Sequence, residues 1–393
     1  MADYIDQIKD TISRLVRIPS YEQEAEKGMP FGKPCADALD CFLSLAADFG
    51  FETNNYDNYA GEVIFGEGEE FAILAHLDVV PAGGGWTRDP FGGEIDEDEG
   101  RIYGRGTMDD KGPAAITLYA LKALKDEGFK PSRKIKLIVG CNEESGWKCI
   151  EHYKKVAHMP DEGISPDANF PVIYAEKGIL HVKFIFKDAA KNFSGLQGGE
   201  RANMVCDYCK VKADGDGAKY GLTLIGGEWI SRGKSAHGST PECGINAIPP
   251  VLRFLGLDGI EKMLFTDKMN LGGLRDETGE LTFSPDIISQ SNDDLLVTCD
   301  IRYPSTFTKK QITDILDKTG VSYEILNDQA PIYNDKDGFL IQTLCGVYNE
   351  VCGADLKPVA IGGGTYARVL KYGAAFGPEE DGEESTIHQA NEY

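Results

Sequence analysis

Residues 71–78 read Phe-Ala-Ile-Leu-Ala-His-Leu-Asp, and the expected fold is built around them. The apolar run that opens this stretch predicts a buried strand, which ends in His76, Leu77 and Asp78. Because side chains alternate across a strand, His76 and Asp78 point to the same side of it. An imidazole nitrogen beside a carboxylate oxygen is half of a binding site for a first-row metal ion.

Four later segments carry further groups of this kind. Residues 104–113 (Gly-Arg-Gly-Thr-Met-Asp-Asp-Lys-Gly-Pro) break the chain before a helix, and Asp109 could supply a bridging carboxylate. Two glutamates, an aspartate and a second histidine occur in residues 142–146, 165–167 and 386–389. Together the segments offer two imidazoles and three carboxylates as ligands, with one carboxylate to spare. That inventory is typical of a hydrolase that uses two metal ions.

The elements that carry these segments follow the α/β pattern. Pro113 stands where the first turn of a helix accepts proline. Residues 134–140 alternate as a strand, and residues 171–175 form another short strand. In open α/β sheets, ligands bind beyond the carboxyl ends of the strands, which is where His76 and the 142–146 segment lie. Further helices are predicted at residues 4–17 and 34–49.

The pattern changes near residue 179. Strands and two helices follow without the earlier strand–helix alternation, so we predict an inserted α+β domain at residues 179–330. A Gly/Lys/Asp-rich stretch to about residue 220 within it has weak periodicity. Helical spacing resumes at residues 335–350. The first domain is therefore predicted to be discontinuous and to comprise residues 1–178 and 331–393.

The composition argues against several function classes. The 40 basic and 64 acidic residues give a formal net charge of −24, which disfavours binding to nucleic acid or to an anionic membrane surface. No stretch approaches the ~18 apolar residues of a membrane span, and the first residues lack the apolar core of a signal peptide. We therefore expect a cytoplasmic protein. Cys206 and Cys209 have the spacing of a redox or zinc pair, but no matching second pair accompanies them.

Each candidate residue also has a plain structural interpretation. A lone histidine at a strand end is more often structural than a ligand, and a histidine near a chain end is usually incidental. An aspartate just before a helix is commonly a turn or N-cap residue. The paired glutamates could simply be solvated. The metal site is favoured by the joint occurrence of all these groups, in this order and in these local contexts.

The motifs resemble those of the co-catalytic zinc peptidases, which include carboxypeptidase G, the aminoacylases, succinyl-diaminopimelate desuccinylase and the PepV-type dipeptidases. Residues 75–81, 104–112 and 143–146 match three metal motifs of that family. Residues 86–91 and 387–392 resemble the PepV-type branch. The resemblance covers nearly the whole chain. It implies an α/β zinc-peptidase catalytic domain, a mixed sheet with flanking helices, with the α+β insertion as a lid domain.

Carried over residue by residue, the resemblance implies five metal ligands. His76 and Asp167 would hold one of two Zn²⁺ ions. Glu144 and His388 would hold the other, and Asp109 would bridge the pair. Mn²⁺ and Co²⁺ are possible substitutes. The peptide bond after Asp109 is expected to be cis.

The resemblance also implies catalytic roles. Glu143 would be the general base for a metal-bridging water and would pass its proton to the leaving amine. Asp78 would orient His76 through its other ring nitrogen. In the lid, His237 would donate to the tetrahedral intermediate. The alternative for His237 is an ordinary histidine in a surface loop.

The implied substrate contacts lie in two regions. In the lid, Asn203 and Arg302 match positions that contact substrate, although Arg302 could equally be a salt-bridge partner at a strand end. The Gly-Gly-Gly-Thr-Tyr-Ala-Arg segment that starts at residue 362 lacks the Lys-Ser/Thr ending of a phosphate loop. The resemblance makes it a loop that binds the carboxyl terminus of a peptide through Gly363, Gly364 and Arg368.

The implied function is zinc-dependent hydrolysis of short, unblocked peptides by a dipeptidase that acts as a monomer or homodimer. One alternative is an N-acyl amino acid hydrolase or desuccinylase on the same dimetal site. An alternative of another class is a metal- or peptide-binding protein without catalysis, which has no need of a base such as Glu143. Two features depart from the family pattern. The insertion is shorter than PepV-type lids, and the chain ends at Tyr393, so a chain truncated there would bind its second metal weakly.

Overall fold

The computed structural model describes residues 4–380, 382 and 385–393. Its contacts divide the chain into two compact units. Unit 1 comprises Met1–Tyr174, Asn334–Pro358 and Thr365–Tyr393, and unit 2 comprises Ala175–Tyr333 and Val359–Gly364. The boundaries predicted from the sequence lie at 178/179 and 330/331, and residues 359–364 were predicted to belong to the first domain.

The segment Val359–Gly364 groups with unit 2 through main-chain contacts. Strand β21 (Val359–Ile361) pairs with strand β9 (Ile173–Glu176), and the Lys177 N–H donates to the Ile361 carbonyl over 3.0 Å. The Gly362 carbonyl accepts a 3.1 Å hydrogen bond from Nη1 of Arg302. Because these partners lie far apart in the sequence, local periodicity carries no sign of them.

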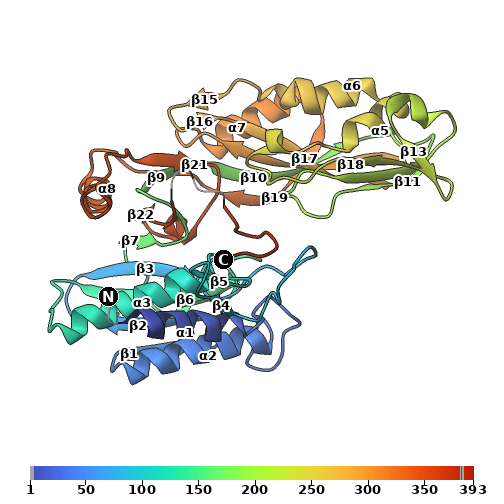
Figure 1. Ribbon diagram of the computed structural model, residues 1–393. Helices are drawn as coiled ribbons and strands as arrows, with labels where there is room; N and C mark the ends of the chain where they lie inside the picture. Colours follow the sequence, from blue (N-terminus) through green and yellow to red (C-terminus); the bar gives the residue numbers. More distant parts are fainter. Residues whose placement is uncertain (1–3, 381, 383–384) are drawn as a thin grey trace. The chain divides into compact units, whose positions relative to one another are not determined.

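Unit 1 is built on a mixed sheet (Figure 1). Besides β9, its strands are β1 (Glu52–Tyr56), β2 (Ala60–Phe65), β3 (Glu70–His76), β4 (Glu94–Asp96), β5 (Arg101–Tyr103), β6 (Lys134–Gly140), β7 (Glu162–Ser165), β8 (Ala168–Asn169), β22 (Tyr372–Ala375) and β23 (Pro378–Glu379). Its helices are α1 (Ile5–Val16), α2 (Lys33–Asp48), α3 (Lys111–Asp126), α4 (Lys148–Val156), α8 (Phe339–Cys352) and the 3₁₀ helix η7 (Tyr366–Val369). From β1 to the strand in which unit 2 begins, the sheet order is β1, β2, β6, β3, β7, β22 and β9. Strands β6, β3, β7 and β22 are parallel, whereas β1, β2 and β6 pair antiparallel.

Helices cover both faces of this sheet, as the contacts of strand β2 show. A Cβ atom at Gly61 would lie 2.9 Å from Leu39 and 2.8 Å from Leu43 of α2. The next residue, Glu62, points to the opposite face and accepts a 2.6 Å hydrogen bond from the Tyr153 hydroxyl of α4. The helices flank a core of buried apolar side chains that continues from α1 through α2 and α3 to the sheet. The expected α/β class is thereby confirmed.

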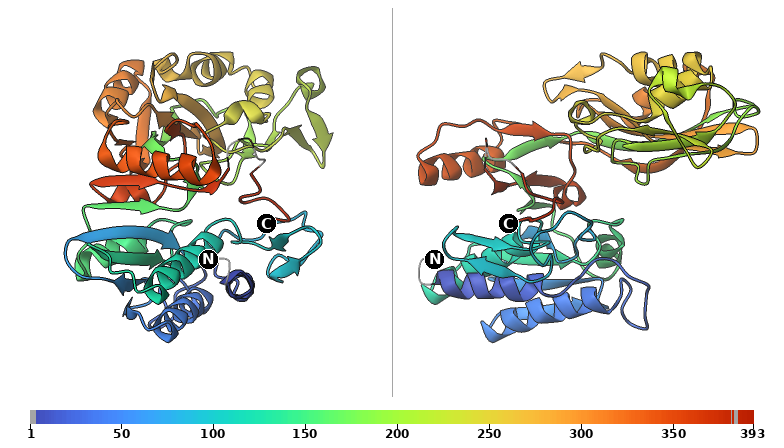
Figure 2. Two further views of the ribbon diagram at one scale, coloured as in Figure 1. Left: turned by 60° about the vertical axis from the view of Figure 1, so that its left-hand side comes forward. Right: turned by 45° about the vertical axis from the view of Figure 1, so that its right-hand side comes forward.

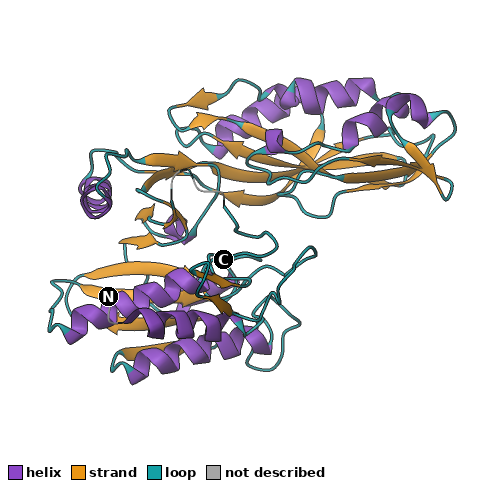
Figure 3. Cartoon of the chain, in the orientation of Figure 1, coloured by secondary structure: helices purple, strands orange, loops and turns teal. Residues whose placement is uncertain are grey.

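Unit 2 is an α+β unit. Its strands are β10 (Gly178–Phe186), β11 (Ser194–Gly198), β12 (Tyr208–Lys212), β13 (Thr223–Ile225), β14 (Glu228–Arg232), β15 (Arg275–Asp276), β16 (Gly279–Glu280), β17 (Thr282–Ser291), β18 (Asp294–Tyr303), β19 (Ser322–Gln329) and β20 (Ile332–Tyr333), with β21. Its helices are α5 (Ile248–Phe254), α6 (Asp258–Glu261) and α7 (Lys309–Leu316), with the short helical turns η2 (Gly217–Tyr220), η3 (Pro241–Cys243), η4 (Lys262–Thr266), η5 (Lys268–Asn270) and η6 (Asp317–Thr319). An antiparallel sheet runs in the order β13, β14, β12, β11, β17, β18, β10 and β19. Figures 2 and 3 show the helices gathered on one face of it.

Two predicted element boundaries are wrong in detail, and one stretch of weak periodicity contains strands. The stretch to about residue 220 contains β11 and β12, which local alternation misses because their register shifts between Ser194 and Gln197. The strand predicted from Pro171 begins only at Ile173, after the cis peptide bond that precedes Pro171. The helix predicted from Asp335 begins at Phe339, because residues 335–338 form a turn closed by the Gly338 N–H and the Asp335 carbonyl.

The structure bears on two features that the sequence disfavours, a membrane span and a redox or zinc site at Cys206 and Cys209. None of the described helices combines the length and the apolar character needed to cross a membrane. Cys206 and Cys209 are free thiols that pack in the hydrophobic core of unit 2. Neither belongs to a candidate metal group among the described residues.

Candidate active site

The five predicted metal ligands converge at one edge of the unit 1 sheet. His76 is the last residue of β3, Glu144 lies in the turn after β6, and Asp167 follows β7. Because these three strands are parallel neighbours, their carboxyl ends share one edge. Asp109 lies one residue before Asp110, the N-cap of α3, and His388 comes from the C-terminal segment.

Asp109 presents one oxygen to each histidine. Its Oδ1 lies 2.9 Å from Nε2 of His76, and its Oδ2 lies 2.9 Å from Nε2 of His388. Nε2 of His388 is also 2.9 Å from Oε1 of Glu144, and Nε2 of His76 is 3.8 Å from Oδ2 of Asp167. The possible ligand atoms thus form two groups that share Asp109, each within 4.8 Å. This is the grouping that the sequence predicts, and the ligand roles stay predictions.

The chemistry of these residues fits divalent cations. Nε2 of His76 and Oδ1 of Asp109 are buried, and within the described part of the chain neither makes a hydrogen bond. Burial raises the pKa of Glu143 to about 8, and Glu144 adds to that shift. Burial, together with the Asp109 carboxylate, raises the pKa of Asp167 well above its usual range. Buried carboxyl groups that resist ionising side by side are groups that bound cations would stabilise.

Asp110 makes a contact with His76 that was not predicted from the sequence. The bond between Asp109 and Asp110 is cis, as expected. The Asp110 side chain is buried, and its Oδ2 accepts a 3.0 Å hydrogen bond from the main-chain N–H of His76. Asp110 therefore ties the start of α3 to the end of β3.

Asp78 lies at the other ring nitrogen of His76, as the resemblance implies, and its main-chain carbonyl makes the closer contact. Nδ1 of His76 lies 2.9 Å from the Asp78 carbonyl oxygen and 3.6 Å from its carboxylate. A carbonyl only accepts, so Nδ1 carries the proton and Nε2 of a neutral His76 is free to bind a metal. The Asp78 carboxylate instead accepts the main-chain N–H groups of Glu143 and Glu144, at 2.9 and 3.0 Å. It thereby fixes the turn that carries both glutamates.

Glu143 is anchored by a residue that the sequence analysis missed. Nε1 of Trp147 donates a 3.0 Å hydrogen bond to Oε1 of Glu143. The indole lies edge-on to the buried ring of Tyr366, with centroids 5.4 Å apart, and Tyr366 also lies edge-on to His76. Trp147 has a φ of 65°, so its contact with Glu143 depends on a left-handed turn and not on helical spacing. Local periodicity carries no signal for such a turn.

In unit 2, the structure brings the segments of Asn203 and His237 together. Met204 and His237 form an antiparallel bridge, and the Gly238 N–H donates to the Asn203 carbonyl over 2.7 Å. Nδ1 of His237 accepts the N–H of Ser239 at 3.2 Å. Because a main-chain N–H can only donate, a neutral His237 carries its proton on Nε2. The exposed imidazole is therefore set to donate from Nε2.

Arg302 makes the salt bridge that was the alternative to a substrate contact. Its guanidinium donates to both oxygens of Asp300 over 2.8 to 2.9 Å, and both side chains are buried. Nη1 donates to the Gly362 carbonyl, which links β18 to the glycine-rich segment. A Cβ atom at Gly238 would lie 2.4 Å from the Asp300 carboxylate, so the His237 segment packs on the same salt bridge.

The predicted carboxylate-binding loop is divided between the units. Gly363 and Gly364 belong to unit 2, whereas Arg368 lies on η7 in unit 1. All three are partly exposed. Their contact with the carboxyl terminus of a peptide stays a prediction.

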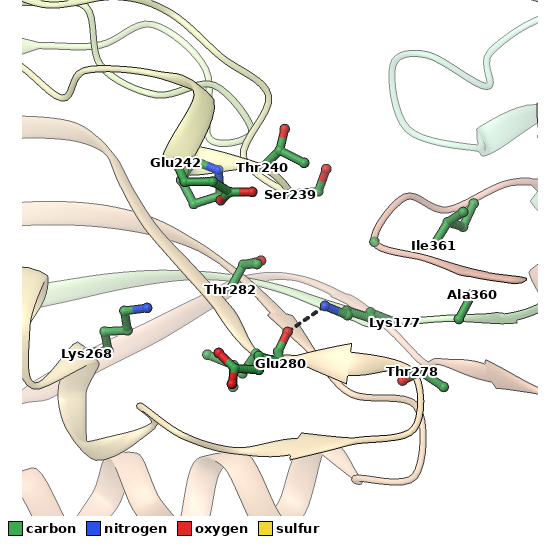
Figure 4. A pocket seen from close by; sticks show the side chains of 13 residues that line it. Lys177, Ser239, Thr240, Glu242, Lys268, Thr278, Glu280, Thr282, Ala360 and Ile361 are labelled. Atoms are coloured by element: carbon green, nitrogen blue, oxygen red, sulfur yellow. Dashed lines mark hydrogen bonds between the residues drawn. The ribbon is translucent and has the colours of Figure 1, made fainter. Parts of the chain in front are cut away.

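A pocket of about 440 Å³ lies in unit 2 (Figure 4). Its lining includes Lys177 and Lys268 as well as Glu242 and Glu280. Lys177 is buried, and its Nζ donates to the main-chain oxygen of Glu280 over 2.5 Å. The hydroxyl of Thr282 is buried there without a hydrogen-bond partner among the described residues. The pocket is thus lined by side chains of both charges.

Comparison with known proteins identifies the family. The model of peptidase family M20/M25/M40 matches residues 72–393. The chain belongs to this family. A curated M20 relative, the Beta-Ala-Xaa dipeptidase of Lactobacillus delbrueckii subsp. lactis, is 34% identical over 433 residues, which cover 99% of this chain and 92% of the relative.

Solved structures show the same fold. The dipeptidase Dug1p of Saccharomyces cerevisiae has a TM-score of 0.64 and 15% identity, covering 100% of this chain and 92% of that chain. Human carnosine dipeptidase 1 has a TM-score of 0.60 and 15% identity, covering 99% and 92%. Membership in the M20 family confirms the expected enzyme class, a peptidase. M20 peptidases use metal ions, and the two groups that share Asp109 are where the described residues could hold them.

Proposed function

We propose that this M20 peptidase is a dipeptidase that hydrolyses short, unblocked peptides with two Zn²⁺ ions. The observation that carries the proposal is Asp109, whose two oxygens each face a different histidine. One carboxylate shared by two ligand groups is the donor set for a pair of ions that act together. The name of the relative that is 34% identical supports a dipeptide as the substrate.

Each ion would have three protein ligands. His76, Asp109 and Asp167 would hold one ion. Asp109, Glu144 and His388 would hold the other. When bound, the two zinc ions supply Lewis acidity to the attacking water and to the scissile carbonyl. Mn²⁺ or Co²⁺ would serve with these oxygen and nitrogen donors.

Glu143 moves the proton in the proposed reaction. Trp147 holds its carboxylate and Asp78 holds its main-chain N–H, so its position is fixed beside the ligands. Glu143 takes a proton from the attacking water and passes it to the leaving amine. Asp78 also keeps Nδ1 of His76 protonated, which leaves Nε2 as the binding atom.

The remaining roles in this proposal belong to residues of unit 2, including the glycine-rich loop, and to Arg368 of unit 1. His237 donates a hydrogen bond from its Nε2–H to the oxyanion, a role supported by the N–H that Ser239 donates to Nδ1. Asn203, on the paired segment, contacts the substrate. Arg302 supports the glycine-rich loop through the Gly362 carbonyl. Gly363 and Gly364, with Arg368, bind the carboxyl terminus of the peptide.

A metal titration coupled to hydrolysis tests the proposal. Metal-stripped protein is titrated with zinc and, separately, manganese, and is assayed on a dipeptide panel and on N-acyl amino acids. Activity on dipeptides should return with two equivalents of metal. Glu143→Ala should still bind two ions but turn over roughly 10²–10⁴-fold more slowly. Glu151→Ala, an exposed change on α4, is the control and should match wild type.

The other results would each replace the proposal. Turnover of N-acyl amino acids without turnover of any dipeptide would make the protein an acyl amino acid hydrolase. Peptide binding without turnover by the zinc-loaded protein would make it a binding protein. Fewer than two equivalents of bound metal would refute the dimetal site. The cytoplasmic location and the monomeric or homodimeric state stay predictions.

A further inference from the structure

The C-terminal segment places a fully buried carboxylate, that of Glu392, beneath the loop that carries Asp109. Oε1 of Glu392 accepts the main-chain N–H groups of Gly106 at 2.9 Å, Met108 at 3.1 Å and Asp109 at 3.3 Å. These N–H groups lie in a loop, where no helix or strand ladder would pair them. Glu392 is therefore the partner that sets the path of the main chain through Asp109.

Arg105 extends this network to the second histidine. Its Nη1 donates to Oε2 of Glu392, and its side chain is 2% exposed. Its Nη2 donates to the main-chain oxygens of His388 and Ala82, each over 3.2 Å. The Gly104 N–H adds a 2.9 Å hydrogen bond to the main-chain oxygen of Glu392. The Arg105–Glu392 ion pair thus holds the main chain of two predicted ligands, Asp109 and His388, that lie far apart in the sequence.

We propose that Arg105 and Glu392 are positioning residues that hold Asp109 and His388 at the spacing required by the second metal ion. This inference rests on the proposed dimetal site. In the Asp109–Glu144–His388 group, the pair holds two of the three ligand segments. In the His76–Asp109–Asp167 group, it holds one.

Because the Arg105–Glu392 pair holds more segments of one ligand group than of the other, breaking the pair should reduce the metal affinities of the two groups unequally. When the pair is broken, the group that contains His388 loses more affinity for metal than the group that contains His76. Residues that orient metal ligands typically contribute 10- to 100-fold to metal affinity. Because both partners are buried, removing one also leaves an uncompensated charge, so the two residues should act as a unit.

Calorimetric metal titration of the full chain tests this without any measurement of activity. Wild type should bind two ions. Glu392→Gln keeps the size of the side chain and an oxygen for the three N–H groups, but it loses the charge that faces Arg105. Arg105→Lys keeps the charge, but it loses the fork that reaches His388. Each variant should weaken one site about 10- to 100-fold and change the other much less. The double variant Arg105→Gln/Glu392→Gln should lose no more than the worse of its own single variants, Arg105→Gln and Glu392→Gln.

Glu62→Gln is the matched control. Glu62 is also a buried glutamate of unit 1, lies 3.8 Å from Lys136, and accepts hydrogen bonds from Tyr56 and Tyr153 over 2.7 and 2.6 Å. This variant should lower the melting temperature and leave both metal affinities unchanged. Wild-type affinities in the Glu392 and Arg105 variants, or equal losses at both sites, would overturn the inference. Fewer than two ions bound by wild type would overturn the dimetal site itself, so the two failures are distinguishable.

Discussion

Among the described residues, one side chain donates to the carboxylate of Glu143: Nε1 of Trp147, at 3.0 Å. Trp147→Phe removes that donor and keeps an aromatic ring against Tyr366. A hydrogen bond to a charged group is worth about 1.5–3 kcal/mol, of which 1.4 kcal/mol corresponds to a factor of ten. We expect kcat to fall about 10- to 100-fold with KM unchanged, because the substrate contacts are untouched. Steady-state kinetics on the best dipeptide measures both constants.

Two further measurements make the Trp147 result specific. Trp229→Phe alters a tryptophan that packs on Phe254 in unit 2, and it should leave kcat unchanged. The Trp147 variant should also bind two equivalents of metal like wild type, since the Trp147 indole donates to Glu143, which is not a predicted ligand. An unchanged kcat would show that Glu143 is held in another way. A loss of bound metal would show that Trp147 supports the ligands instead.

At the scale of elements, the end of β6 packs tightly against the segment that carries Tyr366. A Cβ atom at Gly140, the last residue of β6, would lie 2.3 Å from the Tyr366 hydroxyl oxygen and 2.9 Å from the ring carbon that bears it. Gly140→Ala should therefore displace Tyr366 and cost about 1–3 kcal/mol of unfolding free energy, as overpacked cores do. Denaturant unfolding measures this cost. Metal affinity should fall as well, because Tyr366 packs edge-on to His76.

A second variant separates this collision from a general effect of alanine. Adding Tyr366→Phe to Gly140→Ala removes the nearest atom but leaves the ring carbon, so it should restore part of the lost stability. Gly346→Ala, in the middle of α8, is the control, because a Cβ atom there meets nothing within 4 Å. It should stabilise the helix by up to about 1 kcal/mol. A Gly140→Ala protein as stable as wild type would mean that the Tyr366 segment moves freely.

Strand ends could be predicted from the sequence, and the loops between them could not. The apolar runs of β3 and β6 are local signals, and parallel pairing then places His76 and Glu144 at one edge. The anchoring contacts of Trp147 and Glu392 depend on a left-handed turn and on a segment that returns from the far end of the chain. Neither feature produces a periodic pattern of apolar residues in the sequence. The resemblance to a family assigned the ligands but gave these supporting residues no role.

Across the whole molecule, the 64 acidic residues behind the net charge of −24 include carboxyl groups that are buried in unit 1. Burial raises the pKa of Glu143 to about 8 and raises that of Asp110 well above its usual range. In the metal-free protein, Glu143 therefore binds more protons in the folded state than in the unfolded state between about pH 4.3, the ordinary glutamate value, and about pH 8, and Asp110 acts in the same direction. The contribution of these carboxyl groups to stability falls as the pH rises through that window.

The histidines act in the same direction. Burial lowers the pKa of His76, but the nearby Asp109 carboxylate raises it overall, and Glu144 and Asp109 do the same for His388. Their contribution to stability is fully present below the ordinary histidine value of about 6.5 and is lost as the pH rises through the folded values. Both kinds of group thus predict that the metal-free protein is less stable at pH 8 than at pH 6.

Bound cations should remove most of that pH dependence, because they offset the carboxylate charge that drives it. Free metal at a hundredfold excess over Kd adds about 2.7 kcal/mol of stability per site. We expect the melting temperature of chelator-treated protein to be lower at pH 8 than at pH 6, and the gain on adding zinc to be larger at pH 8. Thermal melts at both pH values, with and without metal, measure this. Glu143→Gln removes the carboxyl group that titrates at this position, so the melting temperature of the metal-free variant should depend less on pH. Equal gains at the two pH values would mean that the buried carboxyl groups do not respond to the ions.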